Sequence, residues 1–548
     1  MSAHAIALAA TLVLAALARL YRLADIPNGF SPDEASYGYN SYSFLLTGRD
    51  RFGNTFPFFT DNFGDLISTS YMWLTAPSIW LFGLDEFAVR LPAALAGIVT
   101  VFVLYKLGEA VVNRWVGLVA ALLLAISPWH IQVSRYAERS QLLPLFFCLG
   151  LWLFLRWRKE GGRKLLWSTL CFGLCFYTYA SARVFAPLFV GGAALFYFRE
   201  LRAEGRQILL PLGILVACLL PAALHWISPA GMARASYLLE LAPLDWLMNY
   251  LSYLGPDYLF FNGDPQIRHS LMDMGQLYFF ELVLLPLGIF FIIRRKRKED
   301  ALLGLWLVLY PIPAALTDPS HAIRSIAGVP LFALVSACGL YQAVLFARGR
   351  NRWLLGVACA GVVVGSVVVY GQRYFVNYPD YAAVRWIYGM REVMHYAEAG
   401  SHRQVYISNR IFLSHILALF YSAYPPENTN AHHCAFSRGI GVITTLRSGA
   451  TRFCRCGRST PVRRNVVTPC CWRWPVRLGK WPNAHRIGSW IPSRCRTGVP
   501  LLKSTNVSSR SHLRHFQAQF RRHFANFIPY GLRQIDAVDE QARFNFLL

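Results

Sequence analysis

Two adjacent carboxylates, Asp33 and Glu34, stand in the first polar stretch of a strongly apolar chain, within the sequence FSPDEASYGYNSY (residues 30–42). A positioned carboxylate can remove a proton from a hydroxyl group, so the acid pair is a candidate for general-base chemistry. A second interpretation is structural, because SPDE is a favourable start for a helix and Asp33 could cap a helix that begins near Glu34. From these residues alone both interpretations stay open.

Basic side chains recur as close pairs in three other polar stretches. The pairs are Arg135 with Arg139 in SRYAERSQ, Arg268 with His269 in GDPQIRHS, and His321 with Arg324 in DPSHAIRS. Each pair could bind a phosphate group, and the first would lie on one face of a helix if its segment is helical. The structural alternatives are a local salt bridge to Glu138 for the first pair and loop scaffolding for the other two.

The elements that must position these residues are membrane helices. The chain has 548 residues, is 55% hydrophobic and 15% charged, and has a mean hydropathy of +0.35, whereas soluble proteins are about 45–50% apolar. A helix needs roughly 20 apolar residues to cross a bilayer. We predict an all-α polytopic membrane protein with about eleven spans, near residues 4–21, 90–112, 115–129, 140–156, 165–180, 184–198, 208–225, 277–293, 301–316, 326–347 and 353–370.

The basic clusters between the spans predict the orientation. They lie at residues 113–114, 156–164, 199–206, 294–300 and 347–352, and all five are cytoplasmic if the N-terminus is cytoplasmic. The outside then contains residues 22–89, 225–276, 317–325 and everything from 371 onward.

A cleaved signal peptide is the alternative for the first segment, which lacks a basic n-region. The stretch 66–84 is predicted to be a helix in the membrane interface, because it is interrupted by Pro77 and several hydroxyl side chains.

In this topology the ionisable residues gather at the outer ends of the spans. They are Arg90, Arg135, Glu138, Arg139, Arg183, Arg268, His269, His321 and Arg324. A proton-coupled transporter or flippase needs charged groups near the midplane, where they are costly and functional. The distribution instead favours an enzyme at the outer membrane surface whose substrate carries a phosphate. A non-catalytic scaffold or receptor would not need an acid pair that faces arginines.

The C-terminal part differs in composition from the rest. Residues 431–548 contribute +17 of the net charge of +25, and residues 431–535 contain no Asp or Glu. Six of the twelve cysteines lie there, without zinc-site spacing: Cys434, Cys454, Cys456, Cys470, Cys471 and Cys495. We therefore predict a transmembrane domain at 1–370, the start of an extracytoplasmic region at 371–430, and a basic, disordered tail at 431–548. The charge of this tail does not indicate a nucleic-acid partner.

We hypothesise that the reading frame shifts between residues 427 and 432, because the preceding stretch ISNRIFLSHILALFYSAYPPE is typical of folded sequence and the tail is not. Resequencing the gene across these codons tests this hypothesis. An intact frame would contradict it.

Several longer stretches carry a resemblance to a known family. They are PDEASYGYNSYSFLLTG, EFAVRLPAALAGIVTVFVLYKLG, SPWHIQVSRYAERSQLLPLF, FYTYASARVFAP, NYLSYLGPDYLFFNGDPQIRHS and PAALTDPSHAIRSIAGVPL. Over residues 1–427 the chain resembles a bacterial member of glycosyltransferase family 39, which contains the protein O-mannosyltransferases. It is also similar to the lipid A aminoarabinose transferase, and both belong to the membrane-embedded GT-C superfamily.

The resemblance implies a reaction. Such enzymes transfer a sugar, with inversion, from a polyprenyl-phosphate donor to a hydroxyl or phosphate of a protein, lipid or glycan acceptor at the extracytoplasmic face. On the matching motif Asp33 is the base, and Glu34 orients it, raises its basicity or binds the acceptor. The donor phosphate would be bound by the three basic pairs: Arg135, Arg139, Arg268, His269, His321 and Arg324. Relatives often have an acidic residue near position 140 or 141, where this chain has Ser140 and Gln141.

The resemblance leaves the metal open. Oligosaccharyltransferases of the superfamily use a divalent ion, which Asp33 and Glu34 could bind together with His269 or Asp257, whereas protein mannosyltransferases are thought to need none. The eukaryotic members carry an inserted β-trefoil module for which this chain has no room, so a multi-pass protein of a prokaryotic plasma (inner) membrane is expected. The sugar and the acceptor are not specified by the sequence.

Overall fold

The computed structural model describes residues 2–226, 242–347, 350–400, 404–407, 411–430, 442–447, 450–455 and 470–475. Structural statements below refer to these residues. The chain divides into two compact units, Met1–Lys480 and Trp481–Leu548, and all described residues belong to the first.

A helix lies at each of the eleven predicted spans, so the prediction of an all-α membrane fold is confirmed. The helices are α1 (Ala3–Leu20), α4 (Glu86–Val111), α5 (Arg114–Ile126), α7 (Leu142–Glu160), α8 (Lys164–Cys175), α9 (Ala182–Phe196), α11 (Leu209–Trp226), α14 (Glu281–Arg295), α15 (Lys298–Leu309), α17 (Val329–Phe346) and α18 (Arg350–Gln372). Among the described residues, six helices are long and apolar enough to cross a membrane. The number is seven if α5 and α6 (Pro128–Ser134), which meet at a bend of 59°, form one span. The chain is therefore a multi-pass membrane protein, and the number of spans stays a prediction.

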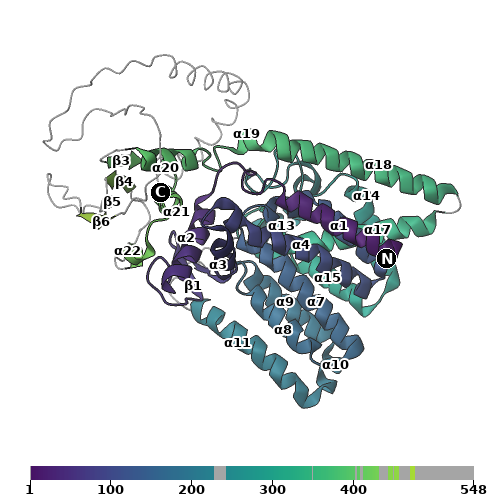
Figure 1. Cartoon of the computed structure of the whole chain (residues 1–548). Coiled ribbons are helices and arrows are strands. Elements are labelled where there is room, and N and C mark those ends of the chain that lie inside the picture. Colours follow the sequence, from purple (N-terminus) through teal and green to yellow (C-terminus); the bar gives the residue numbers. More distant parts are fainter. Residues whose placement is uncertain are drawn as a thin grey trace. The chain divides into compact units, whose positions relative to one another are not determined.

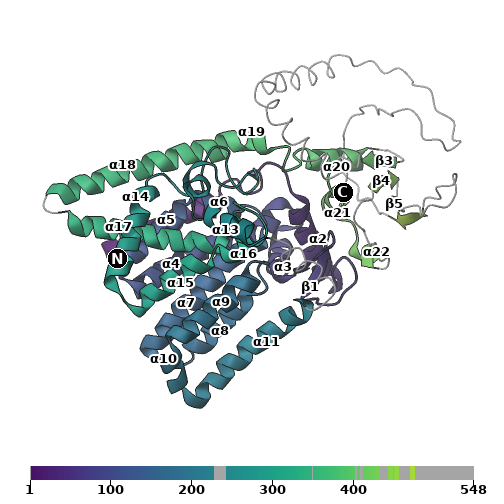
Figure 2. The same ribbon diagram turned by 180° about the vertical axis from the view of Figure 1, so that it is seen from behind.

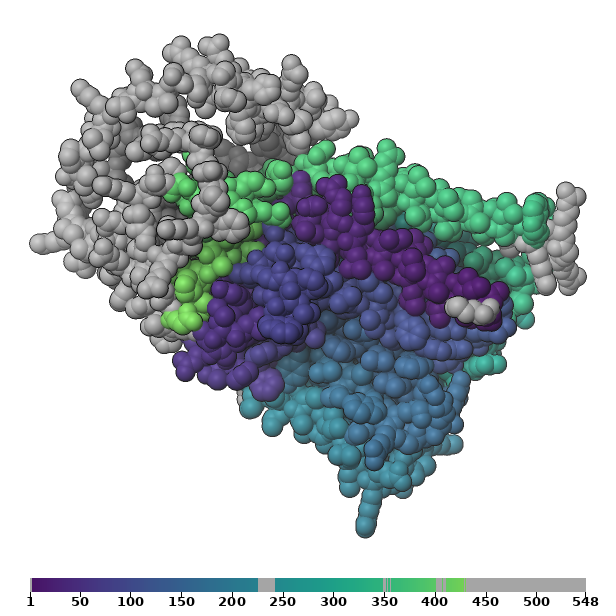
Figure 3. All heavy atoms as spheres, viewed as in Figure 1, coloured from purple at the N-terminus to yellow at the C-terminus, as the bar shows by residue number. Residues whose placement is uncertain are grey.

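The helices differ in how far their neighbours bury them. In the apolar segments that contain α4, α7 and α17, 61–67% of the residues are buried. In those that contain α1, α11 and α18 only 11–17% are buried, and Figures 1 and 2 show α11 and α18 at opposite margins of the helices. Figure 3 shows α1 uncovered along one face. Leucine and valine side chains on these outer helices are exposed, as expected for helices that face lipid.

Two glycines allow α14 and α17 to pack closely. A Cβ atom at Gly339 of α17 would overlap the carbonyl oxygen of Leu284, and one at Gly288 of α14 would overlap that of Val335. Small residues at helix contacts let backbones approach in membranes, where the hydrophobic effect does not drive helices together.

The first polar loop folds into two helices and a hairpin. They are α2 (Pro32–Thr47), α3 (Ser70–Phe82) and the antiparallel strands β1 (Phe59–Asn62) and β2 (Asp65–Ser68), in which Phe59 pairs with Ser68. Ser31 caps α2: its hydroxyl accepts from the backbone N–H of Glu34, and the Glu34 carboxylate accepts from the backbone N–H of Ser31. The helix start was predicted correctly, but its cap is this reciprocal capping box and not Asp33.

The predicted interfacial stretch contains α3, whose end exposes Trp80, Leu81 and Phe82. These apolar side chains fit the predicted place at the membrane surface, which stays a prediction.

The C-terminal region returns to α2 through α21 (Ser414–Tyr421). The rings of Phe30 and Phe420 lie 4.7 Å apart, and the Tyr39 hydroxyl donates to the carbonyl of Tyr424.

Strand β3 (Gln404–Ile407) begins a four-stranded antiparallel sheet with β4 (Val442–Arg447), β5 (Ala450–Arg455) and β6 (Cys470–Pro475). Three strands of this sheet fall in the tail that we predicted to be disordered. The rest of the tail, with Cys434, Cys456 and Cys495, lies outside the described residues, and the frame hypothesis stays a prediction.

A buried ion pair joins α2 to α4. The Arg90 Nε lies 2.8 Å from Oε1 of Glu34, and both side chains are fully buried. Glu34 also accepts from the backbone N–H of Ala137. The remaining Arg90 N–H groups donate to carbonyl oxygens of the chain between α1 and α2, at Leu23, Ala24, Pro27 and Gly29. Every donor of Arg90 is thus used inside the protein, as a buried charge requires.

Replacing Glu34 by Gln should destabilise the fold by about 3–5 kcal/mol, because removal of one partner leaves the Arg90 charge buried without compensation. A matched control is Glu109→Gln, since the side chains of the Lys106–Glu109 pair are 33% and 40% exposed and surface pairs contribute about 0–1 kcal/mol. Denaturant unfolding in detergent measures both variants. Equal effects of the two substitutions would contradict the role given to the Glu34–Arg90 pair.

Candidate active site

Asp33 is the partly open carboxylate at the start of α2, and its side chain is 44% exposed. The Asn62 side chain, from β1, donates to Asp33 Oδ1 at 2.9 Å. The other carboxylate oxygen of Asp33, Oδ2, lies 4.0 Å from Nη1 of Arg268. The carboxylate is therefore oriented by an amide and faces a cation, while part of it stays free to contact a substrate.

Glu34 points into a different environment. Its two oxygens are occupied by Arg90 and by the backbone of Ser31 and Ala137. Successive helix residues are rotated by about 100°, so neighbours in sequence face different sides. Glu34 is buried against Arg90, whereas Asp33 is partly exposed. We therefore assign Glu34 a structural role in place of the predicted role in orienting the base or binding the acceptor.

The second acid of the site is Glu138, which lies between α6 and a 3₁₀ turn at Arg139–Gln141. Its carboxylate accepts from the backbone N–H of Ser140 at 3.2 Å. Burial raises the pKa of Glu138 and the charge of Asp33 adds to the rise, whereas Arg139, the Ser140 N–H and Arg268 lower it; the net pKa is about 7, above the usual 4.5. Asp33, Arg139 and Arg268 are therefore each close enough to Glu138 to shift its pKa.

Arg139 and Arg135 do not form a pair on one helical face. Arg135 ends α6, and Arg139 begins the following 3₁₀ turn after a non-helical link. The Arg139 guanidinium lies over the ring of Tyr179 at 5.1 Å, next to Glu138. Arg135 is fully buried, and its guanidinium donates to carbonyl oxygens at Ala18, Tyr21, Arg22 and Ile26. Only Arg139 remains a candidate phosphate ligand, and Arg135 instead holds the end of α1.

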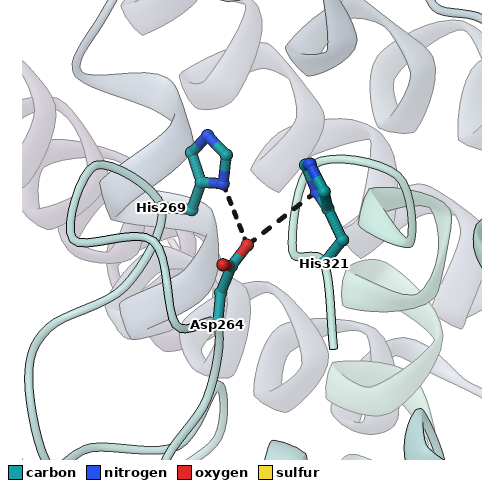
Figure 4. A group of neighbouring side chains, drawn as sticks. All are labelled: Asp264, His269 and His321. Carbon is teal, nitrogen blue, oxygen red and sulfur yellow. Dashed lines mark hydrogen bonds and ion pairs between the residues drawn. The ribbon is translucent and has the colours of Figure 1, made fainter. Parts of the chain in front are cut away.

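The two other predicted pairs are also divided. Arg268 faces Asp33, whereas Nδ1 of His269 lies 2.9 Å from Oδ2 of Asp264. Arg324 forms an ion pair with Asp318, and His321 turns toward Asp264, with Nδ1 at 3.8 Å from Oδ2. Figure 4 shows both imidazoles directed at the one carboxylate. Arg268 is therefore the second candidate phosphate ligand, and the histidines belong to a separate cluster.

The cluster of Asp264, His269 and His321 can hold a metal ion, since one ligand atom from each lies within 4.8 Å of the others. The set expected from the resemblance is not assembled. Glu34 is paired with Arg90, and His269 with Asp264. Asp257 accepts from the side chain of Asn262.

Sequence reasoning missed the site roles of Asn62, Glu138 and Asp264. Asn62 and Asp264 lie in loops or strand ends with no motif, so no sequence signal marks them. Glu138 did have a signal, because the resemblance called for an acid only two residues further on, near Ser140.

Part of the chain matches known proteins. Residues 69–227 match the family model described as dolichyl-phosphate-mannose-protein mannosyltransferase. Two proteins of Bacillus subtilis (strain 168) are similar. The putative mannosyltransferase YycA is 27% identical over 165 residues, which are 30% of this chain and 24% of YycA. The putative mannosyltransferase YkcB is 26% identical over 149 residues, which are 27% of this chain and 20% of YkcB.

The alignments with YycA and YkcB cover about a quarter or less of the length of these relatives. The family match at residues 69–227 contains Arg90, Glu138 and Arg139 but neither Asp33 nor Arg268. Over residues 69–227, the predicted resemblance to the mannosyltransferase family is confirmed.

Two solved structures have weak overall likeness to the chain. ArnT from Cupriavidus metallidurans bound to undecaprenyl phosphate has 12% identity and a TM-score of 0.43, over 78% of this chain and 77% of ArnT. The oligosaccharyltransferase AglB from Archaeoglobus fulgidus, in complex with an inhibitory peptide and a dolichol-phosphate, has 13% identity and a TM-score of 0.41, over 72% and 58% of the two chains.

The raised pKa of Glu138 makes stability depend on pH. Between the unfolded value of 4.5 and the folded value of about 7 the native state binds the extra proton, so this contribution to stability is lost as the pH rises through that window. We expect the apparent Tm in detergent to fall between about pH 5 and about pH 8, and to fall less in Glu138→Gln. The exposed Asp245→Asn is the control, and identical pH profiles for wild type and Glu138→Gln would refute the assignment.

Proposed function

We propose that this chain is a membrane glycosyltransferase that moves a sugar, with inversion, from a polyprenyl-phosphate donor to an acceptor. One observation carries the proposal: Asp33 is a partly exposed carboxylate, oriented by Asn62 and opposed by Arg268. The family description of residues 69–227 supports it, because it names a sugar linked to a polyprenyl-type phosphate.

Asp33 is the general base. An acceptor hydroxyl is a weak nucleophile until a carboxylate takes its proton during attack, and such assistance accelerates reactions typically by about 10²–10⁴. The exposed part of Asp33 provides the position for the acceptor, and the bond from Asn62 fixes the carboxylate plane. Glu34 cannot take this role, because its oxygens are occupied and buried.

Arg268 and Arg139 stabilise the leaving phosphate. As the bond between sugar and donor breaks, negative charge develops on the phosphate, and fixed guanidinium groups stabilise that charge. Both arginines act on Glu138, which lies within the charge field of Asp33. Nη1 of Arg268 lies 4.0 Å from Oδ2 of Asp33, so the proposed base and one proposed phosphate ligand border the same space.

Glu138 balances these charges. Two arginines and one exposed carboxylate would leave a net positive site in the absence of donor, and a second acid with a pKa of about 7 offsets part of that charge. We assign Glu138 to charge compensation and to the positioning of Arg139, not to proton removal from the acceptor.

The proposal extends to the membrane side, the parts of the chain and the acceptor. We propose that the site faces the extracytoplasmic side of a prokaryotic plasma membrane, because the basic clusters between spans favour that orientation. The transmembrane part is assigned to residues 1–370, with an extracytoplasmic region at 371–430. The acceptor is a protein, lipid or glycan hydroxyl or phosphate, and we assign no particular sugar.

Replacing Asp33 by Asn should lower sugar transfer by about 10²–10⁴ and leave folding intact, since Asp33 is half-exposed and Asn retains the contact with Asn62. The assay uses membranes that contain the full chain, radiolabelled sugars on polyprenyl phosphate and extraction of labelled acceptor. Asp245→Asn, an exposed acid on α13 (Pro243–Ser252), is the matched control. Equal transfer by wild type and Asp33→Asn would refute the base assignment.

A further inference from the structure

We infer that Asp264, His269 and His321 form a binding site for a divalent transition-metal ion, best matched by Zn²⁺. These residues come from two segments that are about fifty positions apart in the sequence, and Figure 4 shows both imidazoles directed at the Asp264 carboxylate. Nothing in the proposed sugar transfer requires this cluster, so the inference goes beyond the proposed function.

The distances fit a tetrahedral ion. Zn²⁺ binds histidine nitrogen and carboxylate oxygen at about 2.0–2.2 Å, so two ligand atoms of a tetrahedral site lie roughly 3.3 Å apart. Asp264 Oδ2 lies 2.9 Å from Nδ1 of His269 and 3.8 Å from Nδ1 of His321, which brackets that separation. All three ligand atoms fall within 4.8 Å of one another, so small side-chain rotations suffice for coordination.

The ligand set matches the preference of zinc. Imidazole nitrogen and carboxylate oxygen are among its usual ligands, whereas Mg²⁺ and Ca²⁺ prefer oxygen alone. Three protein ligands leave one tetrahedral position for water or another oxygen ligand. The free cysteines among the described residues lie elsewhere, and none belongs to the cluster.

The cluster is buried and incompletely satisfied by the protein. The side chains of Asp264, His269 and His321 are 1%, 7% and 13% exposed. Nδ1 of His321 is buried and has no hydrogen-bond partner. Buried polar nitrogens normally have a partner, and a metal ion would supply one to this nitrogen while also neutralising the Asp264 charge.

The groups around the cluster hold its ligands in place. Asp264 accepts from the backbone N–H groups of Gln266 and Ala322, each at 2.7 Å. The backbone N–H of His321 donates to the Tyr253 hydroxyl at 3.1 Å. Such secondary hydrogen bonds orient metal ligands and raise affinity.

The ion would tie together the segments 264–269 and 318–325. Arg268, which directly precedes His269, faces Asp33 from 4.0 Å, and its carbonyl accepts from the side chain of Gln132. A bound metal therefore fixes the segment that carries one of the proposed phosphate ligands. The metal has a positioning role and takes no part in the chemical step.

The alternative is a metal-free cluster in which His269 donates to Asp264 and His321 packs beside them. The two arrangements differ in metal content. We would express the full chain with an affinity tag without histidines, purify it in detergent, and measure zinc per chain by mass spectrometry. His321→Ala and His269→Ala should each lose about one equivalent relative to wild type. His395→Ala, an exposed histidine on α20 (Met390–Ala399), should lose none.

Comparison between variants is needed because the tail contains cysteines that could bind zinc separately. Elution on size exclusion checks that each variant is folded. X-ray absorption at the zinc edge of the wild-type protein gives an independent result that needs no variant. Nitrogen and oxygen neighbours with imidazole scattering support the site. Sulfur-only coordination, or equal zinc in wild type and both cluster variants, would overturn it.

Discussion

The buried ion pair of Arg90 and Glu34 is the constraint on which the position of the candidate site depends. A charge removed from water must be compensated by an opposite charge and by hydrogen bonds, or the fold does not tolerate it. Arg90 therefore gathers Glu34 and four backbone carbonyls of the segment 23–29 around itself. This fixes where α1 ends and where α2 begins, and so fixes the position of Asp33.

The same principle explains why so many arginines are buried where the helices end. The Nη atoms of Arg135 donate to carbonyls around the end of α1, and those of Arg19 donate to carbonyls of Ala15, Leu124 and Ala125 and to His130. Irregular backbone near the membrane has carbonyl groups that no helix satisfies. Arginine, with five donors in a fixed fork, satisfies several of them at once. An arginine near the end of a membrane helix can thus serve to bind backbone carbonyls and need not be a ligand for phosphate.

This distinction sets the limit of what the sequence could predict. The helices were predictable at all eleven positions because hydropathy over about 20 residues is a direct consequence of the bilayer. The start of α2 was predictable because Ser31 and Glu34 form a local capping box. The partners of Arg135 and Glu34 were not predictable, because they come from segments that only the tertiary fold brings near. The partner of His269 is Asp264 of the same loop, but the irregular backbone between them has no spacing rule that predicts the contact. The i,i+4 spacing of Arg135 and Arg139 misled us, since a non-helical link separates them.

Three candidate site residues each have a neighbour in sequence that is anchored by structural contacts. Asp33 is partly exposed while Glu34 is buried, Arg139 lies over the Tyr179 ring while Arg135 donates to carbonyls at the end of α1, and Arg268 faces Asp33 while His269 contacts Asp264. In each case the anchored residue lies one to four positions away from the candidate site residue. Loop residues would otherwise lose precision, because a long side chain on a mobile backbone samples many positions. Anchoring the adjacent residue removes that freedom from the backbone and leaves only the side chain of the candidate site residue to move.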